Sequence, residues 1–135
     1  METKLICLDT SVLIDFYRKK DKSKTWLYKL SLKYSLFAVT SVTVFEIFMG
    51  SDDLQNDFWS EFFQRNVILP FDSNAAKRAV IIDKELKSQR KRIDIPDLFI
   101  AACAMEHGMP LATLNLKHFQ RISKLEIVDM EAGFK

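Results

Sequence analysis

Short apolar runs that alternate with amphipathic segments constrain the fold of this chain more than any other feature. The apolar runs predict strands at residues 4–8, 36–40, 67–71, 111–114 and 126–128. The segments between them predict helices at residues 9–20, 26–34 and 42–49, from about 51 onward, and at 72–91 and 95–107. Strands that are separated by helices run parallel and carry helices on both faces. The sequence therefore predicts the α/β class, as a three-layer α/β/α sandwich with a central, mostly parallel sheet of about five strands.

The length and composition of the chain indicate one globular domain over residues 1–135, since 48% of its 135 residues are hydrophobic. Cys7 and Cys103 lie in apolar stretches and are expected to be buried free thiols in a reducing compartment. The sequence opens without a basic-then-apolar leader, and no apolar run reaches the roughly 18 residues that span a membrane. We therefore expect a cytoplasmic protein that does not associate with a membrane.

Polar residues follow the predicted strands at the edge where an open parallel sheet binds its ligands. Asp9 follows the first strand, Glu46 lies one turn into the helix after the second, and Asp97 lies in the first turn of the helix before the fourth. Asn115 follows the fourth strand directly. An Asp in the position of Asp9 is by itself typical of a helix N-cap, so the prediction of a site depends on all four side chains meeting at one edge.

Clustered carboxylates indicate a cation, because like charges raise one another's pKa unless a positive charge compensates. Mg²⁺ or Mn²⁺ is the expected ion, since both prefer oxygen ligands and need few protein carboxylates. Such an ion lowers the pKa of a bound water and neutralises charge on a phosphate, so the predicted chemistry is phosphodiester hydrolysis. His107 and His118 have no neighbouring ligands at metal-binding spacing, and we expect both to be surface or structural residues.

Four segments, taken together, resemble the motifs of a known nuclease family. They are LDTSVLID at residues 8–15, VFEI at 44–47, IPDLFIAACA at 95–104 and LATLNLKHF at 111–119. In this order they are similar to the motifs of PIN domains of the VapC type, which are toxins of toxin–antitoxin pairs, and the match extends over essentially the whole chain. The resemblance implies a PIN-like fold and metal-dependent endoribonuclease activity. It also implies that Asp9, Glu46 and Asp97 bind the metal ion and form the catalytic site together with Asn115.

Supporting roles follow from the same resemblance. Thr10 or Ser11, directly after Asp9, is expected to position the cluster or its water, and Thr113 belongs to the last motif. Asn115 stands where many relatives have Asp, which leaves less negative charge to bind an ion.

Two further acids lie close to the predicted site residues in the sequence. Asp94, three residues before Asp97, either compensates for the missing charge or serves as a helix cap or the partner of an arginine. Asp15 is expected to point largely away from Asp9 on the first helix and to form a structural salt bridge.

The resemblance also implies partners. These are an RNA substrate, with tRNA as the family-level expectation, a cognate VapB-like antitoxin, and a second copy of the chain in a homodimer. Basic residues that can contact RNA phosphates, or equally face solvent, are Lys19, Lys20, Lys22, Lys24, Lys87, Arg90, Lys91 and Arg92. Core packing explains most aromatic rings of residues 45–63, and Trp59 is the one we expect to be exposed at a partner surface.

Two rival functions remain open from the sequence. An aspartyl phosphotransferase also uses an Asp after its first strand, but it needs a second acid two residues later, where this chain has Ser11. A degenerate PIN or receiver-like binding module without nuclease activity fits Asn115 and the modest net charge of +2.

Overall fold

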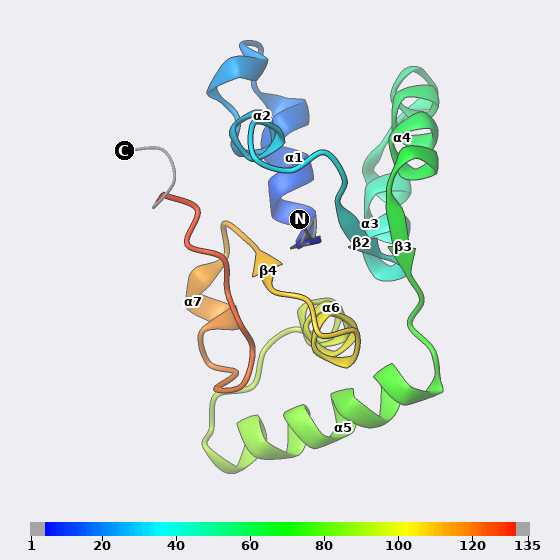
Figure 1. The fold of residues 1–135 in the computed structure, drawn as a ribbon. Helices are drawn as coiled ribbons and strands as arrows, with labels where there is room; N and C mark the ends of the chain where they lie inside the picture. The colour runs from blue at the N-terminus through cyan, green and yellow to red at the C-terminus, as the bar shows by residue number, and fades with distance from the viewer. Residues whose placement is uncertain (1–4, 132–135) are drawn as a thin grey trace.

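The computed structural model describes residues 5–131, which form a four-stranded parallel sheet with helices on both faces (Figure 1). The strands are β1 (Cys7–Leu8), β2 (Ala38–Thr40), β3 (Val67–Leu69) and β4 (Leu111–Ala112). Their order in the sheet is β3-β2-β1-β4, and every pairing is parallel. The predicted α/β class and the parallel sheet are therefore confirmed.

Seven α-helices within residues 5–131 surround the sheet. They are α1 (Thr10–Arg18), α2 (Trp26–Ser31), α3 (Ser41–Gly50), α4 (Asp53–Arg65), α5 (Ser73–Ser88), α6 (Ile95–Glu106) and α7 (Leu116–Phe119), with a 3₁₀ turn η1 at Lys22–Lys24. The short helix α7 was not predicted. None of these helices is long and apolar enough to cross a membrane.

The sheet divides the hydrophobic core into two clusters, because successive side chains of a strand point to opposite faces. Cys7 and Ala38 belong to a cluster formed with α5 and α6, whereas Leu8 and Val39 belong to one formed with α1 to α4. Accordingly, α5 and α6 lie on one side of the sheet, and α1, α2 and α4 lie on the other (Figure 1). Both cysteines are fully buried free thiols, as predicted, and burial raises the pKa of Cys103 to about 11.

The predicted fifth strand is reduced to a single bridge. Leu111 of β4 pairs in parallel with Ile127, but β4 itself ends at Ala112. Residues 126–128 therefore find only one partner residue at this edge of the sheet, which limits the pairing to two backbone hydrogen bonds of 2.9 and 2.8 Å. The predicted start of the first strand at Lys4 lies outside the described residues.

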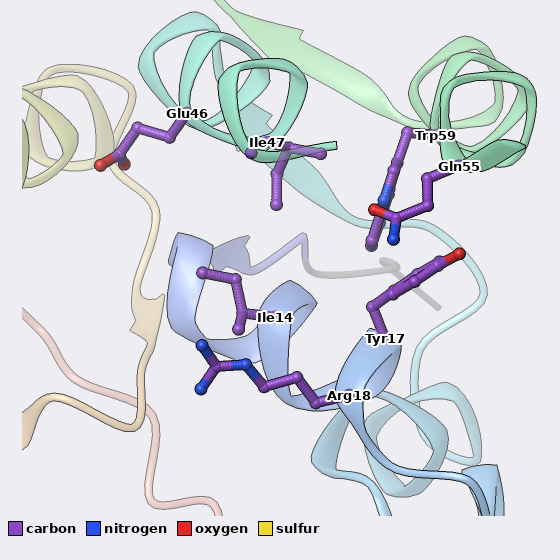
Figure 2. A pocket seen from close by; sticks show the side chains of 8 residues that line it. Ile14, Tyr17, Arg18, Glu46, Ile47, Gln55 and Trp59 are labelled. Atoms are coloured by element: carbon purple, nitrogen blue, oxygen red, sulfur yellow. The ribbon is translucent and has the colours of Figure 1, made fainter. Parts of the chain in front are cut away.

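The prediction that Trp59 is exposed was wrong. Its side chain is 2% exposed and stacks on Phe63, with ring centroids 6.0 Å apart. It extends from α4 toward α1, where Tyr17 lies (Figure 2). The most exposed ring of residues 45–63 is instead that of Phe45 on α3, which is 65% exposed.

Helix α3 begins one residue earlier than expected. Thr40 is its N-cap, because Thr40 Oγ1 accepts a hydrogen bond of 3.1 Å from the backbone N–H of Thr43. The Ser41 hydroxyl accepts instead from the backbone N–H of Phe71 at 3.0 Å. That bond ties the start of α3 to the segment after β3.

Lys22 closes the C-terminal end of α1. Its Nζ donates hydrogen bonds to the carbonyl oxygens of Phe16 (2.7 Å), Tyr17 (3.1 Å) and Lys19 (2.7 Å). A cation at this position satisfies carbonyls that the helix leaves unbonded and interacts favourably with the helix dipole. Lys22, one of the residues considered for RNA contact, therefore has a structural role.

We predict that Lys22→Met lowers the free energy of unfolding by about 1–2 kcal/mol, because it removes these charge-assisted bonds and keeps the apolar stem. Urea unfolding at constant pH measures the change. Lys20→Met is the control, since Lys20 is exposed and makes no side-chain bond within residues 5–131; it should shift stability by less than about 0.5 kcal/mol. Equal stability of the two variants would show that the Lys22 contacts do not stabilise α1.

Candidate active site

Asp9 lies where β1 ends and α1 begins. It is the N-cap residue of α1, but its side chain makes no capping hydrogen bond. Its Oδ2 accepts instead from Ser11 Oγ (2.7 Å) and Thr113 Oγ1 (2.8 Å), and the residue is 3% exposed. Thr113 reaches Asp9 because Leu8 of β1 pairs with Ala112 of β4. The carboxylate is therefore held at the edge of the sheet and is not used as a helix cap.

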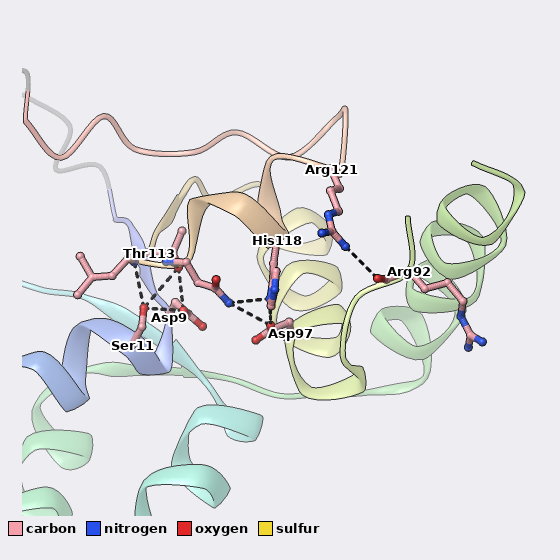
Figure 3. Close-up of polar contacts among 9 residues, drawn as sticks. Asp9, Ser11, Arg92, Asp97, Thr113, His118 and Arg121 are labelled. Carbon is pink, nitrogen blue, oxygen red and sulfur yellow. Dashed lines mark hydrogen bonds and ion pairs between the residues drawn. The ribbon is translucent and has the colours of Figure 1, made fainter. Parts of the chain in front are cut away.

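The two hydroxyls that donate to Asp9 also accept hydrogen bonds from the backbone (Figure 3). Ser11 Oγ accepts from the backbone N–H of Leu114 at 3.0 Å, and Thr113 Oγ1 accepts from that of Asn115 at 2.9 Å. A hydroxyl has a single proton, so a hydroxyl that accepts from the backbone keeps that proton for Asp9. The segment after β4 thus orients the Asp9 carboxylate through both hydroxyls.

Glu46 lies on α3 next to the first turn of α1. Thr10 Oγ1 donates to Glu46 Oε1 at 2.8 Å and also lies 3.0 Å from Thr43 Oγ1. Burial raises the pKa of Glu46, the hydrogen bond from Thr10 lowers it, and the charges of Asp9 and Asp97 raise it further. The three carboxylates from separate sequence motifs therefore lie within electrostatic range of one another.

Asp97 lies in the first turn of α6 and contacts two residues that follow β4 (Figure 3). Its Oδ2 accepts from Asn115 Nδ2 at 3.4 Å and lies 3.2 Å from His118 Nδ1. Burial raises the pKa of Asp97, and the charges of Asp9 and Asp94 act in the same direction, whereas the hydrogen bond and the charge of His118 lower it. The net effect is a raised pKa, so the metal-free protein disfavours the charged form of Asp97.

Asn115 and His118 meet beside Asp97. The side-chain amide nitrogen of Asn115 lies 2.9 Å from His118 Nδ1, and the same nitrogen faces Asp97. Asn115 is therefore a hydrogen-bond donor to the carboxylate in this structure. We expected a surface or structural role for His118, and the structure places it against Asp97. The only signal in the sequence was its spacing of three from Asn115, in a helix too short to show a periodic pattern. His107 contacts the carbonyl of Cys103 at 2.9 Å, in agreement with a structural role.

Within residues 5–131, two other acids, Asp94 and Asp15, make no hydrogen bond to the carboxylate cluster. Asp94 occupies the N-cap position of α6, but its exposed side chain makes no capping bond, and Arg92 pairs with Asp83 instead, at 3.2 Å. The expected side-chain cap and arginine pair of Asp94 are therefore both absent from the described residues. Asp15 pairs with Lys19 at 2.9 Å, which confirms the predicted salt bridge.

Each carboxylate of the cluster uses one oxygen for the hydrogen bonds described above. The other oxygens, Oδ1 of Asp9, Oε2 of Glu46 and Oδ1 of Asp97, accept no hydrogen bond from residues 5–131. In the same part of the chain no three His, Cys, Asp or Glu side chains gather as a ready-made metal site. Mg²⁺ and Mn²⁺ fit such a donor set, because they bind through one or two carboxylates and keep several waters.

Comparison with known families agrees with this arrangement. A family model described as PIN domain matches residues 6–125. The chain belongs to the PIN-domain family.

Relatives of this PIN domain are of the VapC type, as the four motifs indicate. It is 30% identical over 135 residues to Ribonuclease VapC1 of Rickettsia felis, a match that covers 94% of this chain and 97% of that protein. It is 27% identical over 127 residues to the tRNA(fMet)-specific endonuclease VapC of Shigella flexneri, with coverage of 90% and 95%. Among solved structures, it superimposes on a chain of the DNA-bound VapBC of Salmonella typhimurium with a TM-score of 0.82, 25% identity and coverage of 96% and 99%.

A cavity of about 280 Å³ adjoins Glu46 of this PIN domain (Figure 2). It is lined by Ile14, Tyr17, Arg18, Glu46, Ile47, Gly50, Gln55 and Trp59. Glu46 belongs to both the cavity and the carboxylate cluster, so a bound ligand can extend from the cluster along α1. The sequence pattern indicated neither Arg18 nor Gln55 individually, since single polar residues on a helix carry no motif.

We predict that Asp97→Asn stabilises the metal-free protein at neutral pH. Because the pKa of Asp97 is raised above the ordinary aspartate value of 3.8, wild type loses stability as the pH rises from that value through the raised pKa. Asparagine does not titrate, so the advantage of the variant should shrink as the pH falls toward about 4.

Thermal unfolding of both proteins in EDTA across this pH range measures the effect. Asp57→Asn, at an exposed position on α4, shows what removal of a negative charge does away from the cluster. A gain for Asp97→Asn that is independent of pH, or no larger than that of the control, would contradict the prediction.

Proposed function

We propose that this chain is a metal-dependent endoribonuclease that hydrolyses RNA phosphodiester bonds, as the toxin of a VapBC-type toxin–antitoxin pair. The observation that carries the proposal is that the charges of Asp9, Glu46 and Asp97 act on one another. In each of these carboxylates one oxygen accepts a hydrogen bond, and the other accepts none from residues 5–131. The names of its relatives, Ribonuclease VapC1 and tRNA(fMet)-specific endonuclease VapC, support the same activity. We favour tRNA as the substrate class on the basis of the second name.

The three carboxylates are the proposed ligands of Mg²⁺ or Mn²⁺. When bound, the ion supplies a water of lowered pKa and neutralises charge on the reacting phosphate. The fully buried side of the cluster, at Asp9, keeps bulk water from one face of the reacting groups. Glu46 lies at the open side, next to the cavity that the substrate would enter.

The surrounding polar side chains prepare the carboxylates for this role. Ser11 and Thr113 keep Asp9 in one orientation, and Thr10 does the same for Glu46. Asn115 and His118 both contact Oδ2 of Asp97, which leaves Oδ1 for a ligand. A site whose groups are already oriented loses little free energy to reorganisation when the substrate binds.

A VapB-like antitoxin is the proposed protein partner, in line with the VapBC complex of Salmonella typhimurium. The cytoplasm, where RNA is available, is the proposed location of such a toxin. The homodimer implied by the motif resemblance stays a prediction.

The rival functions have less support. A binding module without activity was suggested by Asn115, but this residue donates to Asp97 and leaves the three carboxylates in place. An aspartyl phosphotransferase would need an acid at position 11, where the Ser11 hydroxyl is bonded to Asp9.

We predict that Asp9→Asn lowers the rate of RNA cleavage by at least about 100-fold, the range found when a group that stabilises charge in the transition state is removed. Chelation with EDTA should abolish wild-type cleavage, and added Mn²⁺ should restore it. Asp57→Asn is the matched control, because it removes an exposed carboxylate on α4, away from the cluster. A folded Asp9→Asn protein that cleaves RNA as fast as Asp57→Asn would exclude the proposed site.

We also predict that Asn115→Asp raises affinity for Mn²⁺ by about 3- to 10-fold, because it adds an anionic oxygen beside Asp97. The same charge should destabilise the metal-free protein through repulsion. Calorimetric titration with Mn²⁺ and thermal unfolding in EDTA measure the two effects. Asn74→Asp, an exposed change on α5, adds the same charge elsewhere, and unchanged affinity in Asn115→Asp relative to it would show that position 115 does not act on the metal site.

A further inference from the structure

Two cavities follow α1 away from the carboxylate cluster and share Tyr17 and Arg18. The inner one is the cavity of about 280 Å³ that reaches Glu46. The outer one, of about 490 Å³, is lined by Phe16, Tyr17, Arg18, Lys19, Lys20, Lys22 and Phe58. We call the two together the α1 groove. A strand that passes the carboxylates can continue along this groove to the end of α1.

The α1 groove is basic, and only part of its positive charge is used within the protein. Lys19 pairs with Asp15, and Lys22 binds the carbonyls at the end of α1. Arg18 and Lys20 are exposed and make no side-chain hydrogen bond or ion pair within residues 5–131. Figure 2 shows the Arg18 side chain extended along α1 on the same side as Ile14. These two cations are therefore available to an anion from solution.

The inner cavity combines aromatic walls with an unused amide. Tyr17 and Trp59, with ring centroids 5.8 Å apart, line one end, and the side chain of Gln55 points toward them (Figure 2). The side-chain amide of Gln55 makes no hydrogen bond within residues 5–131. Pockets for drug-sized molecules measure roughly 300–1,000 Å³, so this cavity suits one flat ring with polar edges. An amide offers both a donor and an acceptor to such an edge.

We propose that the α1 groove binds the RNA substrate as a single strand, with a backbone phosphate at Arg18 and one unpaired base in the inner cavity. This proposal rests on the proposed ribonuclease function. The guanidinium of arginine matches a phosphate with two parallel hydrogen bonds, which a lysine cannot do. A base within a duplex is already paired and stacked, so only an unpaired nucleotide can place its base in the cavity.

Charge complementarity favours RNA over a protein segment as the occupant. A protein would need acidic side chains opposite Arg18 and Lys20 while it avoided the carboxylate of Glu46 at the other end of the groove. An RNA strand supplies a phosphate at every nucleotide, and the same polymer carries the bond that the carboxylate cluster is proposed to cleave.

The test measures binding of a fluorescein-labelled oligouridylate of about 12 nucleotides by anisotropy at several NaCl concentrations, in the full-length Asp9→Asn protein, so that the probe is not cleaved. Adding Arg18→Gln should weaken binding about 5- to 10-fold at low salt and reduce the slope of log affinity against log salt by about 0.7. Gln55→Ala should weaken binding without a change in slope, because the amide carries no charge. Lys84→Gln, an exposed change on α5 across the sheet, should leave both quantities unchanged.

Each outcome decides between the alternatives, provided that circular dichroism shows every variant to be folded. Binding by Arg18→Gln that equals binding by Lys84→Gln would overturn the proposal. If Arg18→Gln weakened binding of an RNA duplex to the same extent, the single-strand assignment would be overturned. If Arg18→Gln weakened binding of a protein partner only, the groove would be assigned to that partner instead. Failure of the proposed function gives a different result. The wild-type protein would then not cleave RNA in the presence of Mn²⁺, whether or not Arg18 contributes to RNA binding.

Discussion

The parallel pairing of β1 with β4 is the interaction on which the geometry of the site depends. The register that places Leu8 opposite Ala112 also places Asp9 beside Thr113, one residue further along each strand. A slip of one residue would turn Thr113 to the opposite face of the sheet and remove a donor from Asp9. The pairing of Cys7 with Ala38 positions β2 in the same way, so that α3 starts beside α1 and Glu46 meets Thr10. Strand register, set by the hydrophobic core, therefore determines which polar side chains meet.

Hydrogen-bond donors oppose the charge repulsion among the carboxylates that this register brings near one another. Every carboxylate of the cluster receives a donor from a distant segment: Thr113 for Asp9, Thr10 for Glu46 and Asn115 for Asp97. Ser11 adds a local donor to Asp9, and His118 contacts Asp97. The pKa of Glu46 and of Asp97 nevertheless stays raised, because burial is the largest cause and the neighbouring carboxylates add to it. A cation would remove the same penalty, so the factor that destabilises the metal-free protein also favours metal binding.

The sequence alone predicted the α/β class, because the alternation of apolar runs and amphipathic segments is a local pattern. It also predicted which polar residues follow the strands, because parallel strands bring their carboxyl ends to one edge of the sheet. It failed where the outcome depended on contacts between distant segments. Trp59 lies between Phe58 and Ser60 in a helix rich in polar residues, and only the rotation of α4 against α1 shows that its ring points inward. His118 meets Asp97 only because α7 and α6 come together after β4. The apolar run at residues 126–128 resembles a strand, but the short β4 offers it one partner residue.

The basic residues illustrate why charge runs are hard to interpret from sequence alone. Lys19 and Lys22 belong to the same basic run but have different roles, because they occupy different positions relative to the end of α1. The last carbonyls of α1 need donors, and Lys22 supplies them, while Lys19 is held by Asp15 one turn earlier. These contacts define where α1 ends and from which turn the side chain of Arg18 extends into the cavity beside Glu46. Arg18 thus depends on its structural neighbours for its position, so a substitution at Lys22 can impair the groove without removing any residue that lines its inner cavity.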